Sequence, residues 1–260
     1  MATWLALTKK ELRLGWLPFL IALSAMFITL ILTVYQSARG DFFAEGLLIF
    51  GVLAMLSTIF YMSYYLLVSL ARETKRLHLW LHHPLPGSAL LLSKISSGVL
   101  YQIITTVLIS IPVLIGVILT PEIIEFRSWF DWGATYLFIF IHLLLIALHF
   151  CVWLLVFWSL FLWVKRAAPT FLSVVLTVIF AMAAFALYSW FSTTGVYVAL
   201  THWGAINVEN LLLSLNITLG NLSAGAEAFT IYAGHYVYQF ILTILLFFLT
   251  AWIIDRKVEV

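Results

Sequence analysis

The sequence predicts an all-α polytopic membrane protein with six transmembrane helices. Hydrophobic residues make up 64% of the 260 residues and charged residues only 9%, whereas soluble domains are about half apolar and about a quarter charged. The mean hydropathy is +1.12. Because the chain also lacks the alternating pattern of a membrane barrel, its spans are expected to be helices, which satisfy their own backbone hydrogen bonds.

The uncharged intervals of the chain place the six helices. A helix needs about 20 apolar residues to cross the hydrocarbon core, so charged residues mark the limits of each span. Six intervals between charged residues hold 25 to 42 residues each, and on this reading no Lys, Arg, Asp or Glu lies within a span. The expected cores are 17–35, 47–70, 97–119, 135–163, 168–191 and 234–254.

The basic residues predict the orientation of these helices. With the N-terminus in the cytoplasm, 11 of the 13 Lys and Arg fall on the inner side, and only Arg39 and Arg127 fall outside. Such cytoplasmic enrichment is the strongest topological bias of membrane proteins. We therefore expect a multi-pass protein of the cell membrane with both termini cytoplasmic.

An extracellular segment is expected at 192–232, between the fifth and sixth helices. Within it, residues 210–226 are rich in Leu but carry three Asn and two Gly, which makes them a poor spanning helix. A crossing there would also carry Arg256 and Lys257 to the outer side, against the charge bias. The stretch is expected to be either re-entrant or interfacial.

The N-terminal residues 3–14 predict an interfacial helix. Apolar side chains share one side of it and cations the other, a pattern that sinks one face into the headgroup region and holds the charges near anionic lipid. Gly15 and Pro18 supply a bend before the first span. The alternative is that the stretch simply begins that span. The expected anchors are Trp4, Leu5, Lys9, Lys10 and Arg13.

A polar segment at 72–94 interrupts the apolar chain. Five charged residues, three His and two Pro gather in it. Leu77, Trp80 and Leu81 share a helical face by their spacing, and Pro84 ends that helix. A short cytoplasmic helix that presents a Trp and two Leu among cations is suited to a groove on another protein. The alternative is a basic connector that rests on lipid headgroups.

Three short motifs of the chain resemble those of one transporter family. A Glu after the second span precedes a Leu-rich turn, a Pro and a Ser-Lys at the third span; a Lys-Lys-Glu-Leu precedes the first span; and the C-terminal end is short and charged. In these motifs the chain resembles the ABC-2 type transporter permeases, in particular those of Gram-positive bacterial exporters. The matching residues are Glu73, Trp80-Leu81, Pro84, Ser88, Leu90–Leu92, Ser93-Lys94, Lys9–Leu12 and Trp252–Val260.

The resemblance implies that the chain is half of a transporter. Two permease subunits, identical or homologous, would pair, and two cytosolic ABC ATPase subunits would bind beneath them. The segment 72–94 would then hold the coupling helix. The chain has no G-x-x-x-x-G-K-[ST] motif, so ATP and Mg would be bound by the ATPase and no cofactor by this chain. The implied ATPase contact is formed by Glu73, Leu77, Trp80, Leu81 and Pro84.

His142 and His149 are the candidate polar residues of a substrate path. They lie seven residues apart on the fourth helix and so share a face. They form either a polar patch or proton relay on that path, or hydrogen bonds to neighbouring helices. No motif of a membrane metalloprotease or serine protease is present, so no catalytic residue and no metal site are expected. The net charge of +2 gives no indication of nucleic-acid binding.

The sequence and the resemblance together predict the function. We expect the permease subunit of an ATP-driven exporter that moves an amphipathic or hydrophobic substrate, such as a peptide, an antimicrobial or a drug-like molecule, out of the cell. The chain itself would not be an enzyme. The alternative is a non-transporting membrane scaffold or sensor that recruits a cytosolic partner through the basic segment at 72–94.

Overall fold

The computed structural model describes residues 2–40, 42–74, 86–119, 129–207 and 230–258. It divides into two compact units, Met1–Leu154 and Leu155–Val260. Among the described residues, six helices are long and apolar enough to cross a membrane. The prediction of an all-α, six-helix polytopic membrane protein is confirmed.

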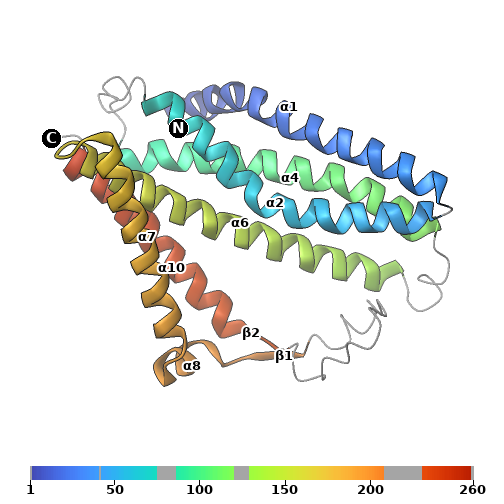
Figure 1. Ribbon diagram of the computed structural model, residues 1–260. Helices are drawn as coiled ribbons and strands as arrows, with labels where there is room; N and C mark the ends of the chain where they lie inside the picture. The colour runs from blue at the N-terminus through green and yellow to red at the C-terminus, as the bar shows by residue number, and fades with distance from the viewer. Residues whose placement is uncertain (1, 41, 75–85, 120–128, 208–229, 259–260) are drawn as a thin grey trace. The chain divides into compact units, whose positions relative to one another are not determined.

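Three helices form the centre of the first unit: α1 (Ala2–Arg39), α2 (Phe43–Thr74) and α4 (Gly87–Leu119). They pack against one another along much of their length (Figure 1). Each extends beyond its predicted core toward its N-terminus, because the chain stays helical where the first charged residues appear. The charged ends of the spans are therefore helical too.

Two apolar clusters hold α1, α2 and α4 together. One gathers four aromatic rings, and its Phe19 and Tyr101 ring centroids lie 4.9 Å apart. The other joins Phe50 and Ala54 of α2 to Ile109 of α4. Between α2 and α4, a Cβ added to Gly51 would lie 2.1 Å from the Val113 side chain, so the small residue lets the two helices approach closely.

The helix α6 (Trp129–Lys165) runs from the first unit into the second. Within the first unit its buried side chains include Leu143, Ala147 and Cys151, which recur every four residues, and Val152 beside them. This spacing is the buried stripe of a helix that packs on one side only. Other large apolar side chains of this stretch, such as Ile141, Leu145 and Phe150, are exposed and suited to lipid.

The second unit contains two further long helices and a small cap. Its elements after α6 are α7 (Thr170–Ser192), α8 (Gly195–Thr201), β1 (Ala205–Asn207), β2 (Thr230–Tyr232), α10 (Ala233–Ile253) and the π-helical turn η2 (Ile254–Val258). The helix α7 begins two residues later than its predicted core because Pro169 before it has an extended backbone, with ψ of 151°. Its side chains are largely exposed, up to 81% for Phe171.

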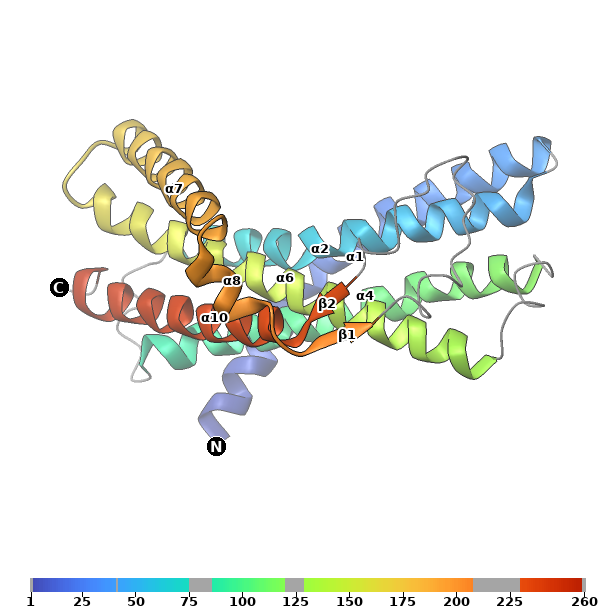
Figure 2. The same ribbon diagram turned by 90° about the horizontal axis from the view of Figure 1, so that it is seen from below.

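The cap is formed by α8, β1 and β2, which lie between α7 and α10 in the chain (Figure 2). The strands β1 and β2 pair antiparallel, with Ala205 opposite Tyr232. The Tyr197 ring of α8 contacts the rings of Phe191 and Tyr238, and its hydroxyl lies 3.2 Å from His235 Nδ1. Burial raises the pKa of Tyr197 to about 12. The cap lies within the predicted extracellular segment, 192–232. Residues 210–226 of that segment lie outside the described residues.

Candidate functional site

A buried lysine lies at the junction of α1, α2 and α4. Lys94 is in the second turn of α4, and its side chain is 1% exposed. Its Nζ donates to Glu11 Oε2 at 2.9 Å, to Ser69 Oγ at 2.9 Å and to Glu73 Oε1 at 3.2 Å. An ammonium group has three protons to donate. All three therefore have an acceptor, one from α1 and two from α2.

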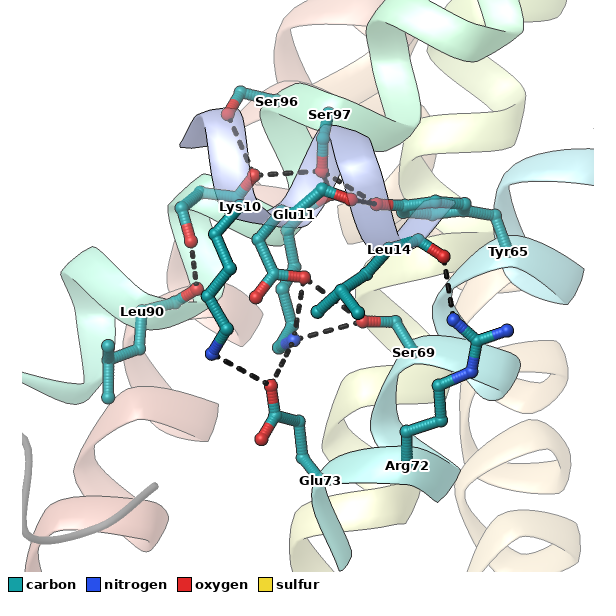
Figure 3. A network of polar contacts seen from close by, with 12 residues as sticks. Lys10, Glu11, Leu14, Tyr65, Ser69, Arg72, Glu73, Leu90, Ser96 and Ser97 are labelled. Carbon is teal, nitrogen blue, oxygen red and sulfur yellow. Dashed lines mark hydrogen bonds and ion pairs between the residues drawn. The ribbon is translucent and has the colours of Figure 1, made fainter. Parts of the chain in front are cut away.

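The helical period brings these acceptors together (Figure 3). Ser69 and Glu73 are four residues apart near the end of α2, so they project from the same face. On α1, the buried stripe is formed by Leu7, Glu11 and Gly15, again at four-residue spacing. Ser69 also donates to the Glu11 carboxylate at 3.3 Å. The two acids consequently reach the Lys94 amine from different helices.

Lys10 and Glu73 form the exposed edge of this junction. Glu73 is 13% exposed, and its Oε1 lies 3.8 Å from Lys10 Nζ, whose side chain is 56% exposed. The Lys94–Glu11 pair, in contrast, is 1% exposed on both sides. Burying a charge costs several kcal/mol unless it is paired and hydrogen-bonded. The pairing is therefore a condition for Lys94 to occupy this position.

Pro18 explains the role of Arg72 beside the junction. A proline inside a helix has no N–H to donate to the carbonyl four residues earlier, and for Pro18 that carbonyl belongs to Leu14. Arg72 of α2 donates to the Leu14 carbonyl instead, at 2.6 Å. A side chain from the neighbouring helix thus supplies the hydrogen bond that the proline removes, and α1 continues through this point.

Two tyrosines tie the same stretch of α1 to its neighbours. Tyr65 of α2 donates to the Glu11 carbonyl at 3.4 Å, and Tyr101 of α4 donates to the Leu12 carbonyl at 2.5 Å. A Cβ added to Gly15 would lie 2.5 Å from the Tyr65 ring and 2.7 Å from the Tyr101 ring. Only glycine lets α1 come this close to both rings. Charged, polar and steric contacts therefore fix α1 within about two turns.

The predicted interfacial helix at 3–14 and the first span belong to the same helical element. One helix, α1, runs through both Gly15 and Pro18. The predicted anchors lie along its first turns: Lys9, Lys10 and Arg13 are exposed, Leu5 is 61% exposed, and Trp4 is half-buried. Arg72 and the two tyrosines bind this stretch, where local rules predict a bend, and the chain stays helical there.

Of the predicted ATPase contact, the structure describes only Glu73. It lies in the last turn of α2, bonded to Lys94, at the start of the polar segment. Leu77, Trp80, Leu81 and Pro84 lie outside the described residues. After these residues, α4 begins at Gly87.

The two candidate histidines of the substrate path lie on α6 and are both half-buried. His149 Nε2 accepts a hydrogen bond from Trp153 Nε1 at 3.0 Å, one turn along the same helix. The His142 ring stacks on Phe138, with ring centroids 6.1 Å apart. The structure therefore gives each imidazole an aromatic neighbour on its own helix.

Sequence reasoning missed three members of the junction: Glu11, Ser69 and Lys94. Every charged residue was taken only as the limit of a span, so contacts between charged residues of different helices were not considered. Lys94 lies inside the apolar helix Gly87–Leu119, where the two acids neutralise it. The available signal was the Leu7, Glu11 and Gly15 stripe, which places an acid on the helix face opposite the predicted cationic one.

No protein-family model, curated protein or solved structure matches the chain. The site is consequently interpreted from its own geometry. Among the described residues, no group of three or more His, Cys, Asp or Glu is placed to hold a metal ion. The three protons of the Lys94 amine are engaged. The geometry of the junction is suited to holding three helix ends together.

Proposed function

We propose that the chain is the membrane subunit of an ATP-driven exporter, and that the junction around Lys94 transmits movement from a cytosolic ATPase to the helices. The observation that carries the proposal is the position of Glu73. It is in the last turn of α2, immediately before the segment 75–85, and its carboxylate binds the amine that also binds Glu11 of α1. A force on that segment reaches three helices through one group.

The proposed mechanism is mechanical. Two permease subunits would pair, and each would bind an ATPase through residues 77–84. When ATP closes the ATPases, they would displace this segment. Because Glu73, Lys94 and Glu11 link the ends of α2, α4 and α1, these helices would move as one body. The substrate would be amphipathic or hydrophobic, in keeping with the apolar side chains of the helices, and would leave toward the outer side.

Photolabelling of an associated ATPase tests this proposal. The tagged chain is purified from the membranes of its native host in mild detergent, and the preparation is labelled with 8-azido-ATP. A labelled second polypeptide is expected with the wild type. It should be lost in the double variant Leu77→Asp with Trp80→Asp, because two carboxylates would enter the apolar contact.

The matched control places two Asp residues on an exposed face elsewhere. Val196→Asp with Leu200→Asp changes two apolar side chains of α8, 62% and 49% exposed, at the predicted outer side. This variant should retain the labelled polypeptide. Absence of any nucleotide-binding polypeptide in the wild type would overturn the exporter. A partner that binds through Trp80 but takes up no label would favour the scaffold or sensor instead.

A further inference from the structure

Four cations gather at one end of the second unit, from two segments far apart in the sequence. Lys165 and Arg166 lie at the end of α6, and Arg256 and Lys257 lie in η2. Arg166 Nη1 donates to the main-chain carbonyl of Lys257 at 2.5 Å, across 91 positions of the chain. All four side chains are exposed. The hydrogen bond therefore holds the two cationic segments side by side.

Two indole rings lie beside the same cations. Lys257 Nζ lies 5.8 Å from the Trp163 ring centroid and 5.8 Å from the Trp252 ring centroid. The two indoles are themselves 45% and 52% exposed. Tryptophan is enriched at the headgroup level of a bilayer, where an apolar ring and a polar N–H are both satisfied. The pair marks the level of the membrane at which the cations lie.

The charge of this end is strongly positive within the described residues. Asp255, which is half-buried, is the acid between the four cations. A guanidinium and an ammonium from two segments joined by a hydrogen bond suit the oxygens of a phosphodiester, which an arginine binds through its planar guanidinium and a lysine as a point charge. Exposed apolar side chains of α7 and α10, such as Phe171 and Leu249, continue from this end along the helices.

We propose that Arg166 and Lys257, flanked by Trp163 and Trp252, form a binding site for the phosphate headgroup of an anionic phospholipid. The indoles and the adjoining apolar helix faces would contact the glycerol and the upper acyl chains. A soluble polyanion or an acidic protein would bind the cations but leave both indoles without an apolar partner. The site depends only on the membrane character of the chain, so it stands apart from the proposed exporter function.

Lipid binding to the purified full-length chain tests the site. The chain in a neutral detergent is titrated with phosphatidylglycerol or with phosphatidylcholine of the same acyl chains, and bound lipid is counted by native mass spectrometry. The wild type should prefer phosphatidylglycerol. Lys257→Gln should weaken that binding about five-fold, since one cation near anionic lipid contributes about 1 kcal/mol. Adding Arg166→Gln should weaken it by about 25-fold in total.

Two comparisons separate a specific site from general attraction and from misfolding. Lys257→Gln keeps the main-chain carbonyl that Arg166 binds, so its unfolding midpoint should match that of the wild type. Arg39→Gln removes another cation that stacks on an aromatic ring, 4.2 Å from the Tyr35 centroid, and should leave the lipid preference unchanged.

Three results would overturn the proposal. The first is equal binding of the two lipids by the wild type. The second is an Arg39→Gln loss as large as that of Lys257→Gln. The third is complete displacement of phosphatidylglycerol by millimolar inorganic phosphate or by a soluble polyglutamate, which would assign the cations to a soluble anion or an acidic protein.

Discussion

Replacing Lys94 with Met would leave two carboxylates facing each other at the junction of α1, α2 and α4. Glu11 is 1% exposed, and its Oε2 would lose the amine at 2.9 Å. Removing one partner of a buried ion pair costs about 3–5 kcal/mol, because the other charge stays buried without compensation. Lys94→Met should therefore lower the free energy of unfolding by about that amount. Glu73→Gln should cost only about 1 kcal/mol, since Glu73 is partly exposed.

The free energies are measured by titration with SDS in mixed micelles, followed by tryptophan fluorescence. Lys10→Met is the matched control, because Lys10 is 56% exposed and 3.8 Å from Glu73, and it should change stability by less than about 1 kcal/mol. The double variant Lys94→Met with Glu11→Met should cost clearly less than Lys94→Met alone, because it leaves no unpaired charge at the centre. A Lys94→Met variant as stable as the control, or a double variant no better than the single one, would refute the reasoning.

Three further predictions concern neighbouring contacts. Gly15→Ala should destabilise the chain by about 1–3 kcal/mol in the same titration, because its Cβ would lie 2.5 Å from the Tyr65 ring. Arg72→Gln should cost about 1 kcal/mol by removing the donor to the Leu14 carbonyl. That cost should shrink in a Pro18→Ala background, in which residue 18 regains its N–H; equal costs in both backgrounds would contradict this account. The pKa of Tyr197 is raised from 10.0 to about 12, so its neutral hydroxyl stabilises the folded state fully below pH 10 and loses this effect as the pH approaches 12. Tyr197→Phe should flatten the fall in unfolding free energy over that range, and an unchanged pH profile would contradict the shift.

The six spans were predictable because their signal is local. A run of some twenty apolar residues between charges is enough to identify a spanning helix, and six such helices are found. The ends of the helices were less predictable, because a charge beyond the apolar core stays helical when a neighbouring helix supplies a partner. Lys94 is the clearest case: its position in the sequence indicates a boundary, while in the structure it lies in the second turn of α4 with its side chain buried.

The continuity of α1 was unpredictable for a related reason. Glycine and proline within four positions weaken a helix by local rules, and the residues that keep the chain helical there come from elsewhere in the chain. Arg72 is 58 positions away from the Leu14 carbonyl that it binds. Only a contact between helices, which sequence periodicity does not reveal, determines whether the helix continues.

These two departures from local expectation occur at the same place, and this coincidence favours the junction as the functional region. Gly15, Pro18 and Lys94 each lower the intrinsic stability of a membrane helix, and each is compensated by a partner on another helix. Natural sequences break local rules mainly at functional or strained sites. A pure packing contact would be served as well by apolar side chains, which avoid the desolvation of three charges. A contact that depends on paired charges instead joins Glu73 to Lys94 and Lys94 to Glu11, so a displacement of Glu73 would be passed to α4 and α1. The junction is thus suited to couple a displacement of the segment after Glu73 to the movement of α1, α2 and α4.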